Sequence, residues 1–193
     1  MSIVKDRVED KVIKTYKHGV RLYDSNNENY GYNFITVVEG NYDFEYIVKF
    51  PNCVIYVYSE ALFIKKIKNH ELFALECIFQ YKEDNYREYF KLNRDTLYVR
   101  VMIESFESYG RCYNYFKNKD KIKFKEELFN SIKSLGVGVQ IALTGKIVNY
   151  ESNAKFLNEI DKLGDSSWEK YFNLYKESCE RMQNNFKRVT NEV

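Results

Sequence analysis

The hydrophobic period of the chain changes once, near Ser59, and this change restricts the fold to a sheet followed by helices. From Tyr32 to Tyr58 the sequence is rich in β-branched and aromatic residues, in runs separated by Gly40 and Pro51. Such runs are typical of strands. Beyond Ser59, hydrophobic residues recur three or four positions apart, which is typical of helices. The sequence therefore predicts an α+β protein whose helices follow its sheet.

The expected elements follow from this pattern. Strands are expected at 32–38, 44–50 and 53–58, and helices at 59–67, 71–79, 95–115, about 124–142, and from 167 onward. The stretch from Ile3 to His18 is expected to be a further helix, with Ser2 as its cap and Gly19 as its stop. Gly136 and Gly138 weaken their own helix, so we expect them to permit close helix contact.

The last expected helix carries a heptad pattern, with hydrophobic residues in alternating steps of four and three. The residues of this seam are Trp168, Phe172, Tyr175, Cys179, Met182, Phe186 and Val189. Such a seam packs against another helix. The helix therefore either docks on the protein's own helices or pairs with a partner, as in a homodimer. We expect residues 1–92 to form an α/β part and 93–193 a helical part packed on it.

Composition limits the classes of function. The formal net charge is only +2, from 30 basic and 28 acidic residues, so contact with nucleic acid must be local. No apolar run is long enough for a spanning helix, and we expect a cytoplasmic protein with no membrane partner. The cysteines lack C-x-x-C spacing and only two histidines are present, so no resident metal is expected. The 18 tyrosines against one proline fit the coding bias of a phage or an AT-rich bacterium.

Three segments, in order, resemble motifs of the polymerase-beta-like nucleotidyltransferase superfamily. The first runs from Gly19-Val20 through Tyr23-Asp24 to Tyr30-Gly31-Tyr32-Asn33, where the family has a Gly-Ser turn and then Ser-Asp-x-Asp entering a strand. The second comprises 57–59 and 74–79, similar to the family's strand, helix and "LExLF" segment. The third, 130–147, is similar to the late helix of predicted nucleotidyltransferases that accompany RNA-repair genes. The resemblance implies a small mixed sheet of the nucleotidyltransferase type followed by a helical bundle.

The residues that carry the family's chemistry are altered. Nucleotidyl transfer uses acidic side chains to hold magnesium on the triphosphate, and carboxylates at i and i+2 of a strand share one face. Gly31 and Asn33 stand at those two positions. Val54 stands near the position at which the family has its third carboxylate. Val20 replaces the serine of the turn that follows Gly19. The resemblance therefore implies a degenerate active site with no catalytic residue.

We expect such a protein to be a binding module. Aromatic rings stack on bases and cations bind phosphate, so the former active cleft would take a nucleotide or an RNA end. The residues expected to border this cleft are Arg21, Tyr23, Tyr30, Tyr32 and Lys133. A protein partner is the other form of this hypothesis, with a phage-encoded modulator of a host enzyme as one version. Tyr30 and Tyr32 would otherwise only fill the space of the lost ligands.

Two alternatives remain open from the sequence. Asp43 and Glu45 have i, i+2 spacing, so an active enzyme could use them as relocated carboxylates, and only this alternative requires magnesium and a nucleoside triphosphate. Charges on an edge strand are otherwise a solvated surface. The resemblance could also be accidental, in which case the chain is an unrelated α+β protein.

Overall fold

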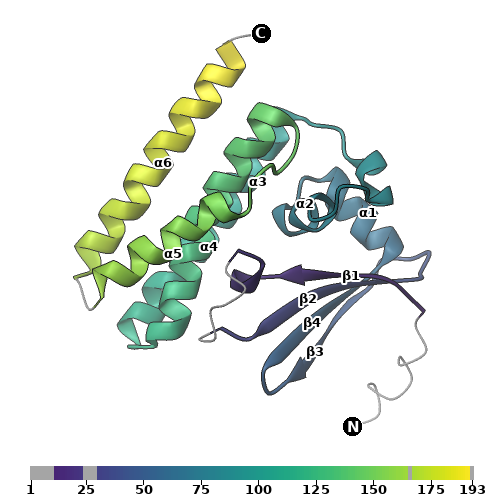
Figure 1. Cartoon of the computed structure of the whole chain (residues 1–193), viewed down its shortest axis with the longest axis horizontal. Helices are drawn as coiled ribbons and strands as arrows, with labels where there is room; N and C mark the ends of the chain where they lie inside the picture. The colour runs from purple at the N-terminus through teal and green to yellow at the C-terminus, as the bar shows by residue number, and fades with distance from the viewer. Residues whose placement is uncertain (1–10, 24–29, 165–166, 192–193) are drawn as a thin grey trace.

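The computed structural model describes residues 11–23, 30–164 and 167–191, which form four strands and six α-helices. A sheet lies beside a bundle of long helices, and two short helices lie over the sheet (Figure 1). The sheet contains β1 (Val12–His18), β2 (Tyr32–Val38), β3 (Glu45–Phe50) and β4 (Cys53–Ser59). The helices are α1 (Glu60–Lys68), α2 (Leu72–Phe79), α3 (Arg94–Lys117), α4 (Lys121–Thr144), α5 (Glu151–Leu163) and α6 (Trp168–Asn191). The α+β class predicted from the sequence is therefore confirmed.

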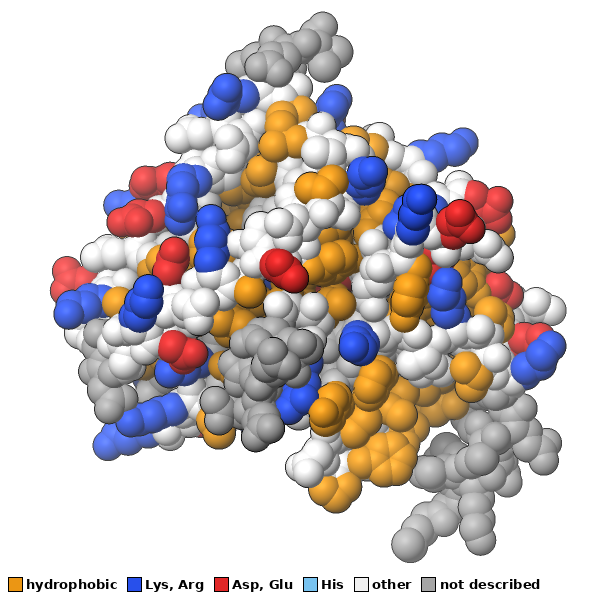
Figure 2. Space-filling model, viewed as in Figure 1, with side chains coloured by type: hydrophobic (Ala, Val, Ile, Leu, Met, Phe, Trp, Pro, Cys, Tyr) orange, Lys and Arg blue, Asp and Glu red, His pale blue; other side chains and the backbone are white. Residues whose placement is uncertain are grey.

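The sheet is mixed and has the order β1-β2-β4-β3. β2 and β4 are parallel, whereas β1 pairs antiparallel with β2 and β3 pairs antiparallel with β4. The three strands expected from the sequence thus lie in one sheet. Hydrophobic side chains gather over the region of this sheet in the space-filling view (Figure 2), and on this sheet Tyr32 and Phe50 are both exposed.

The expected helix from Ile3 to His18 is wrong over its C-terminal part, because residues 12–18 form β1. Ser2 and residues 3–10 lie outside the described residues. Two tertiary interactions hold the strand. It pairs with β2 along its length, and the buried carboxylate of Asp84 accepts hydrogen bonds from Lys14 Nζ at 2.7 Å and Tyr16 Oη at 2.9 Å. Val12, Ile13 and Thr15 also favour a strand because they are β-branched.

The helices α1, α3 and α4 begin at residues whose side chains cap them. The Ser59 hydroxyl accepts a hydrogen bond from Leu62 N and caps α1, and Asn93 and Asp120 cap α3 and α4 in the same way. Gly145, with φ of 74°, ends α4. α5 was not expected from the sequence, although its buried Phe156, Leu157 and Ile160 recur at helical spacing.

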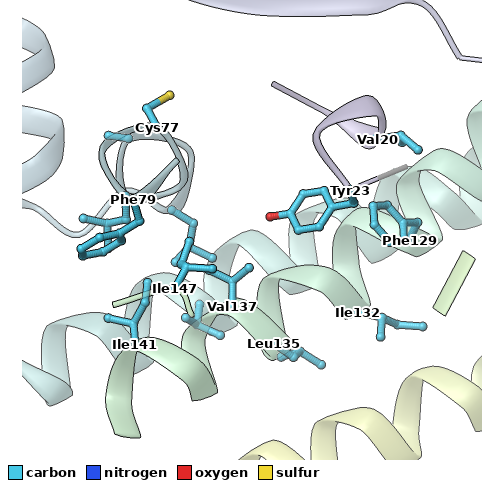
Figure 3. Close-up of a cluster of buried hydrophobic side chains, with 14 of the residues drawn as sticks. Val20, Tyr23, Cys77, Phe79, Phe129, Ile132, Leu135, Val137, Ile141 and Ile147 are labelled. Carbon is cyan, nitrogen blue, oxygen red and sulfur yellow. The ribbon is translucent and has the colours of Figure 1, made fainter. Parts of the chain in front are cut away.

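α2 lies in the interior, as a helix that is hydrophobic on all sides should. Seven of its eight residues are buried. Figure 3 shows Phe79 on the side of this helix that faces hydrophobic residues of α4, and Cys77 on the other side. One hydrophobic core extends from Tyr16 of β1 to Phe186 of α6.

Gly136 and Gly138 of α4 permit close helix contact, as expected. A Cβ on Gly138 would lie 2.4 Å from Val101 Cγ2 of α3, and a Cβ on Gly136 would lie 2.2 Å from Asn153 Oδ1 of α5. α4 therefore packs closely on both neighbouring helices.

α6 docks on the protein's own helices through most of the expected seam. Tyr175 stacks on Tyr109 of α3 with ring centroids 4.0 Å apart, and Phe186 meets Tyr98 at 5.3 Å. The seam is displaced at its start, where Tyr171 is buried and Phe172 is 43% exposed. Among the described residues, no helix is both long enough and apolar enough to cross a membrane.

Candidate functional site

A cleft of about 660 Å³ lies between the sheet and the helices α3 and α4. Its floor is a row of side chains that crosses all four strands. The register pairs His18 with Asn33, Asn33 with Val54, and Val54 with Lys49. Paired residues in adjacent strands point to the same face, so the four side chains face the cleft together.

The helical wall is built by side chains that recur on one face of each helix. α3 contributes Glu104, Ser108, Arg111 and Tyr115, and α4 contributes Lys123, Glu126, Glu127, Asn130 and Lys133. Steps of three and four place side chains on one helical face. Because α3 and α4 are antiparallel neighbours joined by a short turn, both polar faces meet the sheet. The cleft is therefore polar on its helical side.

An ion pair is buried at the base of the cleft. Lys133 Nζ lies 2.7 Å from Glu76 Oε1, and the two side chains are 4% and 0% exposed. Burial alone would lower the pKa of Lys133, but the charges of Glu76 and Glu104 outweigh it and raise the pKa above its usual value. Lys133 therefore stays protonated, and its charge balances the only acidic residue of α2.

Two further ionisable groups of the cleft have displaced pKa values. Burial raises the pKa of Glu104 to about 7, against the opposing effect of the Lys133 charge. Burial lowers the pKa of His18 to about 4, although Glu76 lies 3.8 Å from its Nδ1 and acts in the opposite direction. At neutral pH the imidazole is therefore uncharged, whereas Glu104 keeps its proton to a higher pH than an exposed glutamate does.

The mouth of the cleft carries charges of both signs, because Glu126 and Glu127 line it beside the basic residues. Lys49 and Lys123 are exposed, and Lys49 forms no ion pair with any residue in the described part of the chain. Arg111 contacts Glu127 at 3.0 Å and donates to Ser108 Oγ at 2.9 Å. Lys49 therefore offers its ammonium group to a ligand, whereas Lys123 Nζ lies 4.0 Å from Asp120 Oδ2.

Aromatic rings line the opposite part of the cleft. Tyr58 of β4 stacks on Phe73 of α2 with centroids 5.1 Å apart. Tyr56 and Phe73 both meet the His18 ring edge-on, at 6.1 and 6.5 Å. A flat ligand group could therefore contact ring surfaces while its charged end meets the lysines.

The structure brings together three of the five positions that the sequence predicts to be a degenerate active site. Gly19, Asn33 and Val54 all line the cleft, and a Cβ on Gly19 would lie 2.7 Å from Asn33 Nδ2. Val20 is buried in the short helix that follows Gly19. Gly31 precedes β2, and a Cβ there would lie 3.3 Å from the Asn52 carbonyl oxygen, outside the cleft lining.

The residues expected to border the cleft are dispersed, and of these only Lys133 lines it. Tyr23 is buried beside Phe129, with its hydroxyl toward α2 (Figure 3), and Lys133 Nζ lies 5.4 Å from its ring centroid. Tyr30 is buried, and its carbonyl oxygen accepts a hydrogen bond from Arg21 Nε. The Arg21 guanidinium stacks on Tyr32 at 4.0 Å.

The alternative pair of carboxylates lies elsewhere. Asp43 precedes β3 and forms an exposed ion pair with Lys65 at 2.7 Å. Glu45 begins β3 on the cleft side of the sheet, but neither carboxylate lines the cleft. Within the described residues, no group of three or more His, Cys, Asp or Glu side chains could hold a metal ion.

Sequence reasoning missed most of the charged residues of the site. Glu76 could have been recognised as a single acidic residue within the otherwise apolar run 72–79. Glu104 and Arg111 carry no such signal, because charged residues on a long helix usually face solvent.

No protein-family model matches the sequence, and no curated protein matches it as a relative.

Proposed function

We propose that the protein is a non-catalytic binding module whose cleft takes a phosphorylated nucleoside, or the phosphorylated end of an RNA. The observation that carries this proposal is the row formed by His18, Asn33, Val54 and Lys49. On a nucleotidyltransferase-like scaffold, carboxylates would occupy the centre of this row. An amide and an isopropyl group occupy it here, and a lysine stands at its outer end.

The properties of the cleft support a small ligand with a phosphate group. Its volume of about 660 Å³ lies in the range of about 300–1,000 Å³ that is usual for small-molecule pockets. The exposed Lys49 and Lys123 offer point charges to phosphate, and Tyr56, Tyr58 and Phe73 offer apolar surface to a base. A concave polar site of this kind favours a nucleotide over a protein surface.

The floor of the cleft is uncharged at His18, whose pKa burial lowers to about 4. This part of the floor therefore offers neither a cation to phosphate nor a carboxylate to a metal ion, and the phosphate is expected at the lysines. Neutral nitrogen and amide groups from His18 and Asn33 can instead form hydrogen bonds with ribose or base atoms.

Calorimetric titration with nucleoside triphosphates and with a 5′-phosphorylated oligoribonucleotide tests the proposal. We expect binding without added magnesium, weakened in Lys49→Gln and in Lys123→Gln. Lys82→Gln, which removes an exposed lysine outside the cleft lining, is the matched control and should bind as the wild type does. An absence of binding to every nucleotide would overturn the proposal.

A transfer assay separates this proposal from the active-enzyme alternative. Labelled nucleoside triphosphates are incubated with the protein, magnesium and RNA, and the products are resolved by size. We expect no transfer. Magnesium-dependent transfer that is lost in Asp43→Ala would establish the alternative and refute a non-catalytic role.

A further inference from the structure

A second pocket, lined mainly by aromatic rings, lies beneath the turn between α3 and α4. Its volume is also about 660 Å³, and it shares only Tyr115 with the cleft. The aromatic side chains of its lining are Tyr113, Tyr115, Phe116, Phe124, Trp168 and Tyr171. Phe124 and Tyr171 are buried, whereas Tyr113 is 38% exposed. The pocket therefore has a buried aromatic floor and aromatic walls that reach solvent.

The walls have the spacing of packed rings. Trp168 lies 4.8 Å from Tyr113 and 5.2 Å from Phe116, measured between ring centroids. Phe124 and Tyr171 meet edge to face at 4.6 Å. These contacts hold the rings in place before any ligand arrives, so a flat ligand would lose little freedom to the ordering of the pocket.

Lysines surround this pocket. Between residues 117 and 125 the chain has five lysines and one aspartate, in a chain whose total net charge is only +2. Four of these lysines line the pocket: Lys117, Lys119, Lys121 and Lys125. The fifth, Lys123, lines the neighbouring cleft. Lys or Arg side chains are visible at the lower left of Figure 2, where Figure 1 places this turn.

Hydrogen bonds define the backbone of the turn that carries these lysines. Lys119 has φ of 59°, and its backbone N donates to the Phe116 carbonyl oxygen while Asp120 N donates to that of Tyr115. This is the left-handed closure typical of helix C-termini. Asp120 then caps α4 through a hydrogen bond from Lys123 N. The positive charge is therefore part of a defined turn.

Some of the lysines that line the pocket interact with other groups of the protein, and others are available to a ligand. Lys125 contacts Asp161 at 2.6 Å, and Lys117 Nζ lies 4.2 Å from the centroid of the Tyr113 ring. Lys119 is exposed and has no ion pair with any residue that the structure describes. An anion at the rim of the pocket would thus meet Lys117 and Lys119 first.

We propose that this pocket binds an unpaired base of a single-stranded nucleic acid, with the lysines of the turn binding the phosphates on either side. Aromatic stacking and backbone-tracking cations are the two elements of sequence-independent single-strand binding. A duplex hides the faces of its bases, so only an unpaired base can enter such a pocket. The spread of lysines across the turn favours several phosphates over a single nucleotide. This inference does not depend on the ligand of the cleft.

The single tryptophan of the chain makes the proposal directly measurable. Because Trp168 is a wall of the pocket, a stacked base should quench its fluorescence. We expect a short oligouridylate to quench it saturably, with an affinity that falls as salt rises, by a log–log slope of about 0.7 per phosphate contact. A labelled oligouridylate, followed by anisotropy, measures the same binding independently of tryptophan.

Substitutions locate the contacts. Lys119→Gly removes the charge and suits the positive φ at that position, and with Lys117→Gln it should reduce both affinity and salt slope. Tyr113→Ala should weaken binding by about tenfold through lost stacking. The Lys82→Gln/Lys146→Gln variant removes two exposed lysines outside the turn and serves as the charge-matched control.

Three results would overturn the proposal. The oligonucleotide could leave Trp168 fluorescence unchanged, whether or not anisotropy shows binding elsewhere. The lysine variant of the turn could bind as tightly as the charge-matched control. Uridine monophosphate could compete as strongly as the oligonucleotide at equal concentration, which would make the pocket a mononucleotide site. Lys49→Gln, which alters only the cleft, should leave the Trp168 response intact, so failure of one proposal is distinguishable from failure of the other.

Discussion

Lys133 of α4 and Glu76 of α2 form an ion pair of 2.7 Å in which both side chains are almost completely buried. The pair joins two helices that are far apart in sequence and forms the base of the cleft. The pair as a whole contributes little net free energy to folding, whereas leaving one of the two charges buried without its partner costs much more.

Removing one partner of this pair should therefore destabilise the fold strongly. For Lys133→Met we expect the free energy of unfolding to fall by about 3–5 kcal/mol, because Glu76 is left buried and unpaired. Glu76→Leu/Lys133→Met should recover most of this loss. Urea denaturation measures both variants.

A lysine of the same helix provides the control for that prediction. Lys125 pairs with Asp161 at 2.6 Å, but the aspartate side chain is 51% exposed. Lys125→Met should change stability by less than about 1 kcal/mol. If Lys125→Met and Lys133→Met lowered the free energy of unfolding by the same amount, burial would not explain the cost of breaking the Lys133–Glu76 pair.

The protonation of Glu104 should make stability depend on pH. Its pKa is raised from 4.5 to about 7 in the folded protein, so between these values the folded state holds a proton that the unfolded chain has lost. Its contribution to the free energy of unfolding therefore falls as pH rises through this window. In Glu104→Gln, stability relative to wild type should rise from pH 4.5 to about 7 and then level off.

His18 should show the opposite dependence. Its pKa is lowered from 6.5 to about 4, so the unfolded chain binds the extra proton between these values and the contribution of His18 rises with pH. In His18→Asn, stability relative to wild type should fall from about pH 4 to 6.5. Denaturant titrations across this range measure both slopes, and slopes of the same sign would refute the assignment.

Glycines on neighbouring helices should respond in opposite directions to the same substitution. A Cβ on Gly138 would lie 2.4 Å from Val101 Cγ2, whereas one on Gly110 would meet nothing within 4 Å. We expect Gly138→Ala to cost about 1–3 kcal/mol through overpacking and Gly110→Ala to stabilise by about 0.5–1 kcal/mol through helix propensity. Thermal unfolding distinguishes them, and a stabilising Gly138→Ala would show that α3 and α4 are not in close contact there.

Introducing two carboxylates on the floor of the cleft tests whether this row has the geometry of a metal clamp. Asn33 and Val54 are paired across parallel strands, which lie about 4.8 Å apart. Asn33→Asp/Val54→Asp should be less stable than wild type without magnesium, because like charges meet, and should gain melting temperature when magnesium is added. The wild type should show no comparable gain. A double variant that is indifferent to magnesium would indicate that this row does not have the geometry of a clamp.

Much of the fold could be predicted because it depends on local patterns. The strands β2, β3 and β4 are rich in β-branched and aromatic residues, which favour strands. The helices α1, α3 and α4 begin at residues whose side chains cap them. The close approach of neighbouring helices at Gly136 and Gly138 was also predictable. Glycine destabilises the interior of a helix, so it is expected there where a neighbouring helix leaves no space for a side chain. α5 could have been found by its spacing but was not.

The sequence by itself determined the α+β class, the strands β2 to β4 and the order of the helices α1 to α4. It also places no carboxylate at Gly31, Asn33 or Val54, the positions that the resemblance compares with metal ligands. Only the tertiary structure decided that residues 12–18 form a strand, because pairing with β2 and the hydrogen bonds to Asp84 outweigh a local pattern that also suits a helix. It also decided which charges share the cleft. Glu76, Glu104 and Lys133 lie on three different helices, and no local period relates residues that meet only when those helices pack.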